Sequence, residues 1–296
     1  MKLLIPKTDM KEALTGLSKI VNTRASLPIL GHIRLDADNK SIRLSGTDLD
    51  QTATYSINGH SSLPKTQCML IPLDALQSIL KTTQGPTIEI ENSGKSEITI
   101  GSSVGGQVIT RRVNSPDLDE WPNLPEPAAT KPVEPKLLEH IRQALPFAST
   151  EDSRYVLKGV YLDVSDKNCH KVVATDGRRL TALNSVRLPL TDSVIVPASK
   201  FLSWNKLTGE SSIGADKTNE LLTLIVGPWT YTTKLTSGTY PNYKQVIPGG
   251  NGLCSLEISA DDTELLIKAL PSLPSFGSCG DTVVLRMEPS AIRVYV

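Results

Sequence analysis

The chain has 296 residues, with 31 Lys and Arg against 31 Asp and Glu, so its formal net charge is zero. A hydrophobic content of 39% is enough for packed cores and excludes global disorder, while the length suggests two or three domains. Neutrality excludes a nucleic-acid-binding protein that is basic throughout, but not one with a locally basic surface. The apolar runs are too short for a membrane span, so we expect none.

The N-terminus and the cysteines favour a cytoplasmic protein. The first apolar block is short and is followed at once by Lys7, which is not typical of a signal peptide. The cysteines lie far apart without a C-x-x-C pair, so we expect buried free thiols rather than disulfides, and no zinc site or other cofactor. They are Cys68, Cys169, Cys254 and Cys279.

In the first part of the chain, two segments have apolar residues at three- and four-residue steps, which predicts helices. In the segments between and after them apolar and polar residues alternate, which predicts strands. The expected helices are Lys7–Val21 and Leu73–Thr83, with Pro72 in the first turn of the second. The expected strands are Ile33–Ala37, Ser41–Ser45, Gln51–Ile57, Thr87–Asn92, Glu97–Ile100 and Gln107–Val113.

The same order follows a proline-rich linker, Ser115–Pro135. We expect helices at Pro135–Ala148 and Ala198–Leu207, with strands at Gly159–Val164, Lys171–Ala174 and onward to Lys234. A glycine-rich joint after Pro248 leads to a helix capped by Ser259 and running to about Leu270. Two last strands are expected at Thr282–Glu288 and Ala291–Val296.

Three pairs of segments repeat in the same order, each pair about 120 residues apart. They are Thr47-Asp48-Leu49 with Thr175-Asp176-Gly177, Met69–Leu76 with Val194–Phe201, and Glu120–Asn123 with Thr239–Asn242. Asp48 and Asp176 are expected to cap turns at strand ends. We therefore predict domains at 1–125, 126–248 and 249–296, the last an incomplete copy, each full copy using a unit of one helix and three or four antiparallel strands twice.

Four segments resemble the DNA polymerase III beta subunit, the bacterial DNA sliding clamp: Arg24–Gly31, Gly46–Leu49, Ala174–Leu180 and Tyr240–Pro248. The resemblance implies an α+β DNA clamp fold of tandem domains, with helices inside and sheets outside. It also implies a processivity factor that encircles duplex DNA and tethers the replicative polymerase. The implied partners are the DNA polymerase III alpha subunit, the clamp loader and other proteins with clamp-binding motifs, besides a second copy in a homodimer ring if the third domain is complete.

Cations on the expected helices are candidates for phosphate contact. They are Lys7, Lys11, Lys19, Lys81, Lys136, Arg142, Lys200, Lys206 and Lys268. Any one of them is equally well an ordinary solvated side chain. The resemblance adds Arg24 and Tyr155 as DNA contacts, although Glu151 and Asp152 beside Tyr155 would repel phosphate.

The resemblance also implies a hydrophobic groove that accepts short linear motifs. The matching residues are Leu157, Thr175, Gly177, Arg178, Arg179, Leu180, Pro241 and Val246. The alternative is that Leu180 and Val246 belong to the core and that Asp176-Gly177 is only a tight turn.

No nucleophile pattern, phosphate-binding loop or metal spacing indicates an enzyme. The second functional hypothesis is a clamp-like scaffold that binds peptides but does not encircle DNA. Glu151, the non-aromatic Val156 and the short third domain favour it.

Overall fold

The computed structural model describes residues 2–58, 66–92, 94, 96–218, 220–249, 257–272, 283–288 and 291–295. The chain divides into two compact units, Met1–Asn242 and Tyr243–Val296, and each is described by itself. Within the described residues no helix is long and apolar enough to cross a membrane.

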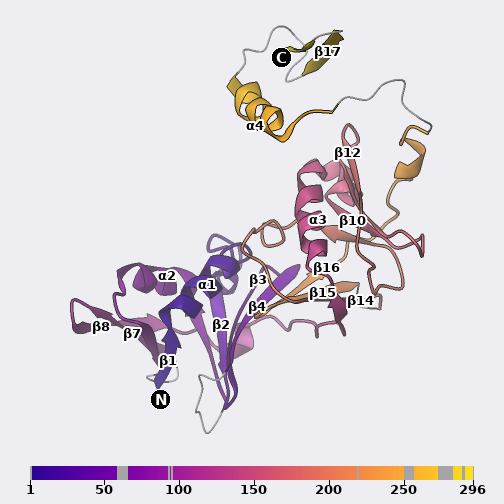
Figure 1. Cartoon of the computed structure of the whole chain (residues 1–296). Coiled ribbons are helices and arrows are strands. Elements are labelled where there is room, and N and C mark those ends of the chain that lie inside the picture. The colour runs from indigo at the N-terminus through magenta and orange to yellow at the C-terminus, as the bar shows by residue number, and fades with distance from the viewer. Residues whose placement is uncertain are drawn as a thin grey trace. The chain divides into compact units, whose positions relative to one another are not determined.

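The first copy has two amphipathic helices that lie against each other (Figure 1). Helix α1 (Lys7–Leu17) buries Met10, Leu14 and Leu17, and α2 (Leu73–Thr82) buries Leu76 and Ile79, as the periodicity predicts. Its strands are β1 (Lys2–Pro6), β2 (His32–Ala37), β3 (Ser41–Thr47), β4 (Gln51–Asn58), β5 (Gln67–Pro72), β6 (Thr87–Asn92), β7 (Glu97–Val104) and β8 (Gln107–Asn114).

The second copy has one α-helix, α3 (Lys136–Ala144), which buries Leu137, Leu138 and Ile141. Its strands are β9 (Lys131–Val133), β10 (Gly159–Asp163), β11 (Lys171–Thr175), β12 (Leu180–Asn184), β13 (Val194–Pro197), β14 (Ser211–Asp216), β15 (Leu221–Val226) and β16 (Trp229–Lys234).

A continuous sheet joins the two copies. Its strand order is β5-β2-β3-β4-β16-β15-β14-β9, and the two four-stranded sheets have the orders β1-β6-β7-β8 and β12-β11-β10-β13. At the junction β16 pairs antiparallel with β4, so that Trp229 lies opposite Tyr55. The copies are therefore connected by backbone hydrogen bonds and shared core as well as by the linker.

The helix predicted at Ala198–Leu207 is wrong, because this segment forms successive turns. The Ser199 hydroxyl accepts a hydrogen bond from Phe201 N at 3.1 Å. One bond, Ser203 N to Ser199 O, spans four residues as in an α-helix, but Trp204 N to Phe201 O and Leu207 N to Trp204 O span only three. Phe201, Trp204 and Leu207 are all buried, and the Phe201 ring lies 5.1 Å from that of Trp229. Packing against β16 outweighs the helical periodicity of the segment.

Other boundaries differ by less. Helix α1 ends at Leu17 rather than Val21, and α3 ends at Ala144 and continues as the 3-10 helix η3 (Leu145–Phe147). Pro72 is the N-cap of α2 rather than part of its first turn. The linker contains β9 and the 3-10 helix η2 (Leu118–Glu120), and it also buries Trp121. Strands β1, β5, β12 and β13 were not predicted individually.

The second unit holds helix α4 (Ala260–Ala269) and the antiparallel pair β17 (Val284–Glu288) and β18 (Ala291–Tyr295). The Ser259 hydroxyl accepts a hydrogen bond from Asp262 N at 3.1 Å, which confirms the predicted cap. The predicted strand ends at residues 282 and 296 lie outside the described residues. Cys68 and Cys169 are free and half-buried, and Cys254 and Cys279 lie outside the described residues.

Candidate functional site

Two turns occupy equivalent places in the two copies and share the same hydrogen bonds. The Thr47 hydroxyl donates to Gln51 O at 2.9 Å and accepts from Leu49 N at 3.0 Å. In the second copy the hydroxyl of Thr175 donates to Arg179 O at 2.6 Å and accepts from Gly177 N at 3.0 Å. The carboxylates of Asp48 and Asp176 each accept from the two backbone N–H groups that follow, as predicted for capped turns.

The surroundings of these turns differ. In the first copy, Gln51 Oε1 accepts hydrogen bonds from Ser199 Oγ at 2.6 Å and Tyr231 Oη at 2.9 Å, so the second copy binds the last residue of this turn, while Leu49 and Asp50 stay exposed. Burial raises the pKa of Tyr231 to about 12. In the second copy, Gly177, Arg178 and Arg179 are exposed within their unit. The second turn is therefore the more exposed of the two.

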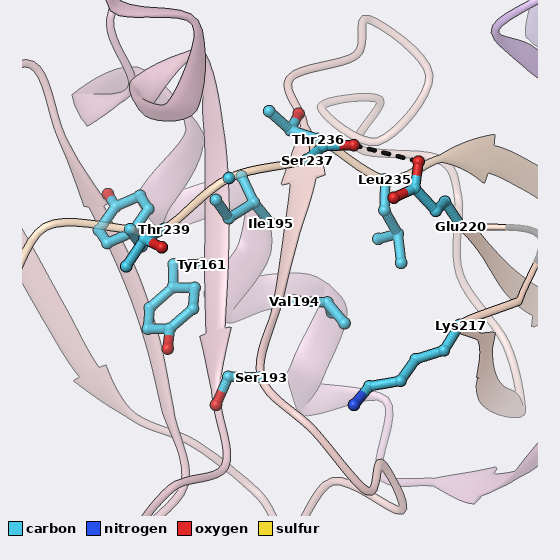
Figure 2. Close-up of a pocket in the computed structure, with 12 residues that line it drawn as sticks. Tyr161, Ser193, Val194, Ile195, Lys217, Glu220, Leu235, Thr236, Ser237 and Thr239 are labelled. Carbon is cyan, nitrogen blue, oxygen red and sulfur yellow. Dashed lines mark hydrogen bonds between the residues drawn. The ribbon is translucent and has the colours of Figure 1, made fainter.

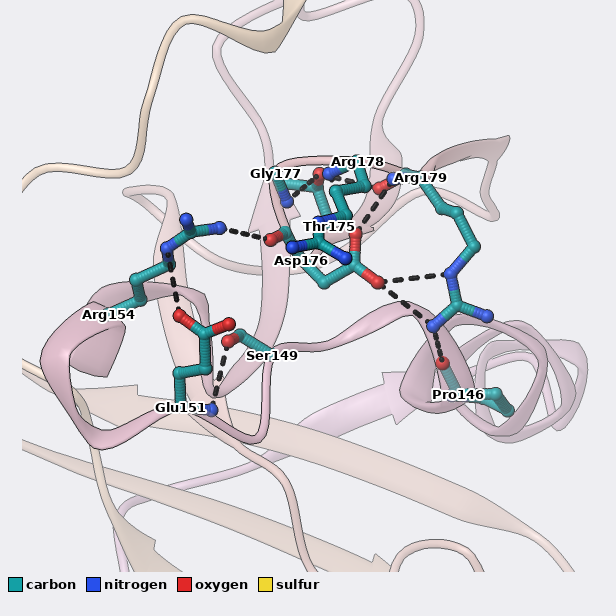
Figure 3. Close-up of polar contacts among 9 residues, drawn as sticks. All are labelled: Pro146, Ser149, Glu151, Arg154, Thr175, Asp176, Gly177, Arg178 and Arg179. Carbon is teal, nitrogen blue, oxygen red and sulfur yellow. Dashed lines mark hydrogen bonds and ion pairs between the residues drawn. The ribbon is translucent and has the colours of Figure 1, made fainter. Parts of the chain in front are cut away.

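One ion pair and several hydrogen bonds to backbone groups hold the second turn together (Figure 3). The backbone N–H groups of Arg179 and Arg178, together with the Arg179 guanidinium, hold the pKa of the Asp176 carboxyl well below its usual range. Arg179 Nη2 lies 2.9 Å from Asp176 Oδ2 and 3.4 Å from Pro146 O. The Arg179 guanidinium also lies 5.6 Å from the centre of the Phe147 ring. Arg179 thus ties the turn to η3, which follows α3.

Five of the predicted groove residues belong to this turn or flank it: Thr175, Gly177, Arg178, Arg179 and Leu180. Thr175 pairs with Leu180 across β11 and β12, and Leu157 is buried. Leu180 is half-buried and Pro241 is exposed, so Leu180 is not simply a core residue. Val246 is 70% exposed, but it lies in the second unit and its position relative to the groove stays a prediction.

A hollow that sequence reasoning missed lies beside residues 235–240 (Figure 2). Its volume is about 450 Å³, and Tyr161 and Tyr240 line it with rings stacked 4.6 Å apart. None of the predicted groove residues lines it. The repeat in the sequence pointed to Tyr240 in the lining of this hollow. Trp121 and Tyr240 occupy equivalent positions in the two copies, and both side chains are buried.

The expected cationic elements of the first unit form a row. Helix α2 contacts α1. Gly16 of α1 lies so close to Trp204 that an added Cβ atom would be 2.9 Å from its ring, which places α1 beside the 198–207 turns. Those turns in turn contact α3, where Arg142 Nη2 donates to Leu207 O at 2.8 Å. The four segments carry more cations than carboxylates: Lys7, Lys11, Lys81, Lys136, Arg142, Lys200 and Lys206 against Asp9, Glu12, Asp74 and Glu139.

The individual cations of this row differ in availability. Most are exposed: Lys11, Arg24, Lys81, Lys136, Lys200 and Lys206. Lys19 is half-buried, just beyond the end of α1. Lys7 Nζ donates to Thr83 O at 2.6 Å, and Arg142 is half-buried and bound to Leu207 O, so both are engaged within the protein. Lys268 lies in the second unit, 3.5 Å from Glu264.

The loop that presents Tyr155 is the 3-10 helix η4 (Asp152–Leu157), and the Tyr155 side chain is 59% exposed. Glu151 and Asp152, the two acidic residues expected to repel phosphate here, both have partners. Glu151 Oε2 lies 3.3 Å from Arg154 Nε, and Asp152 pairs with Lys158, which lowers the pKa of Asp152. Their charges are compensated within the loop. No cluster of metal-binding side chains occurs in the part of the chain that the structure describes.

Comparisons with known proteins agree with this architecture. Residues 1–125 match the DNA polymerase III beta subunit, N-terminal domain, and residues 133–242 match its central domain. The chain is 26% identical over 268 residues to the beta sliding clamp of Pseudomonas putida, covering 84% of this chain and 69% of that protein. It is also 26% identical to that of Caulobacter vibrioides, covering 100% of this chain and 81% of that protein.

A solved structure shows the same fold. It is the Helicobacter pylori beta clamp bound to a DNA ligase peptide, with a TM-score of 0.79 at 23% identity, covering 100% of this chain and 83% of that chain. The likeness confirms the predicted α+β clamp fold class.

Proposed function

The chain belongs to the DNA polymerase III beta subunit family, the bacterial DNA sliding clamps, and on that premise we propose that it encircles duplex DNA and tethers the replicative polymerase in the cytoplasm. The observation that carries the proposal is the row formed by α2, α1, the 198–207 turns and α3. Cations in such a row contact the phosphates of DNA whatever its base sequence, and a protein that slides along DNA requires contacts of this kind.

Within this row the proposed DNA contacts are Lys11, Lys19, Lys81, Lys136, Lys200 and Lys206, with Arg24 in the loop after α1. Arg142 was predicted with them, and its bond to Leu207 O favours a role in holding the 198–207 turns to α3. Tyr155 stacks on an exposed base or lies along the backbone. The ion pairs of Glu151 and Asp152 weaken the argument for a scaffold that does not encircle DNA.

The proposed partner site is the groove at the exposed second turn. Leu157, Leu180 and Pro241 supply apolar contacts, and Thr175 with Arg179 supplies polar ones at the rim. Gly177, Arg178 and Val246 complete the set. We propose that motifs of the polymerase alpha subunit, the clamp loader and other proteins bind here, as the Helicobacter pylori relative binds a DNA ligase peptide.

Salt dependence of duplex binding tests the DNA face. We expect the logarithm of the association constant to fall with the logarithm of salt concentration by about 0.9 for each neutralised phosphate. Lys81→Gln is expected to reduce this slope by about one phosphate equivalent, measured by fluorescence anisotropy across a salt series.

Lys131→Gln is the matched control, because Lys131 is equally exposed but lies on β9 at the far edge of the sheet, outside the row. A wild-type slope near zero contradicts DNA binding through this face, and equal slopes for both variants contradict the assignment of Lys81.

Strand β8 supports a proposed ring of two copies. It is the edge of the sheet β1-β6-β7-β8, with Val108 and Ile109 66% and 53% exposed. An exposed edge strand with apolar side chains is a template for pairing with another chain. We therefore expect Ile109→Lys to shift the protein toward monomer in light scattering over a concentration series, while Ile109→Val keeps the wild-type mass. An unchanged mass for Ile109→Lys contradicts closure at this edge.

A further inference from the structure

Arg154 connects the loop of Tyr155 to the turn of the groove (Figure 3). Its Nη1 donates to the backbone carbonyl of Asp176 at 2.6 Å, and its Nε lies 3.3 Å from Glu151 Oε2. The Arg154 guanidinium therefore lies against Glu151 on one side and donates a hydrogen bond to the Asp176 carbonyl on the other. Arginine suits this role because its planar group presents several donors in fixed directions.

Gly177 provides the space that this contact needs. An added Cβ at Gly177 would lie 2.6 Å from Arg154 Nη1. Gly177 has a φ of 87°, but the equivalent Leu49 of the first copy accepts a φ of 80° with a side chain. The backbone conformation alone therefore does not require glycine, but a side chain here would displace the Arg154 guanidinium from its present position.

A second contact holds the loop from its other side. At Gly238, in the segment that leads to Pro241, an added Cβ would lie 2.9 Å from Val156 Cγ1 and 3.3 Å from Tyr155 Oη. Tyr155 is thus presented by a loop fixed between two segments that also form the groove. While the hydrogen bond from Arg154 to Asp176 O persists, a movement of the loop that carries Tyr155 therefore also moves the turn at Asp176.

We propose that Arg154 is a positioning residue that couples the two binding sites, so that nucleic acid at Tyr155 raises the affinity of the groove for a peptide. The coupling rests on the proposed function. Both ligands favour the arrangement in which Arg154 holds Asp176 O: nucleic acid because the loop then holds the exposed Tyr155 in one place, and peptide because the turn that forms the groove wall is then fixed. By linkage, each ligand must raise the affinity for the other by the same factor.

A thermodynamic cycle tests this coupling on the full chain. The probes are the labelled DNA ligase peptide of the Helicobacter pylori complex and a duplex with a single-stranded overhang. Peptide affinity is measured with and without saturating DNA, and DNA affinity with and without peptide. We expect a coupling factor of about fivefold in the wild-type protein, within the usual range for linked sites. Arg154→Gln is expected to reduce the factor to about one.

Three further variants separate coupling from general damage. Arg187→Gln removes an equally exposed arginine outside both sites and is expected to keep the wild-type factor. Glu151→Gln keeps the bond to Asp176 O and is expected to keep most of the factor. Arg154→Lys retains the charge but not the fork, and an intermediate factor is expected.

Two results overturn the inference: a wild-type factor of one when both probes bind, or a wild-type factor retained by Arg154→Gln. Failure of either probe to bind the wild-type protein would instead overturn the proposed function, and the coupling with it.

Discussion

Trp229→Ala is expected to lower the free energy of unfolding by about 3–5 kcal/mol, the range for deleting a large buried aromatic side chain. Trp229 is 1% exposed, and its ring lies 4.8 Å from Tyr55, 5.1 Å from Phe201 and 5.8 Å from Trp204. Gly16 of α1 contacts the same ring so closely that no side chain fits there. The substitution therefore opens a cavity where the first copy, the second copy and α1 meet.

Urea denaturation followed by circular dichroism measures this loss. Tyr155→Ala is the control, because it removes an aromatic side chain that is mostly exposed and should change the free energy by no more than about 0.5 kcal/mol. If Trp229→Ala unfolds at the wild-type urea concentration, the aromatic cluster does not hold the two copies together.

Leu180→Asp is expected to weaken peptide binding at the groove by about 100-fold, equivalent to about 2.7 kcal/mol. Leu180 is half-buried beside Thr175, and a carboxylate there would meet an apolar peptide side chain without a compensating partner. Hot spots of this kind carry most of the energy of a small interface. Isothermal titration calorimetry with the DNA ligase peptide provides the measurement.

Thr181→Asp is the matched control, since it introduces the same charge at the next position of β12, on the opposite face of the strand. Duplex binding of both variants should keep the wild-type salt slope, which shows that the unit remains folded. Wild-type peptide affinity in Leu180→Asp would place the partner site elsewhere.

Local signals in the sequence were reliable where a short segment makes its own hydrogen bonds. The motifs beginning at Thr47 and Thr175 predicted two capped turns, and the side chains of Asp48 and Asp176 form them with neighbouring backbone groups. The periodicity at Lys7–Val21 and Leu73–Thr83 predicted helices, which form at Lys7–Leu17 and Leu73–Thr82 because one face of each is apolar and buried. The same reasoning was wrong at Ala198–Leu207, where the apolar residues pack around Trp229 instead of along one helix face.

The sequence by itself therefore determined the repeat, the α+β class, the family and the two capped turns, because these depend on short-range patterns. Only the tertiary structure decided which of the two equivalent turns is more exposed. Ser199 and Tyr231, far away along the chain, bind Gln51 at the end of the first turn, whereas its counterpart Arg179 is exposed within its unit. The tertiary structure also decided where the charged side chains lie and which of them are paired. Neutrality of the whole chain conceals a row of cations on contacting elements, and Glu151 and Asp152 are compensated by Arg154 and Lys158. Pairings between distant residues set both outcomes, and no local pattern encodes them.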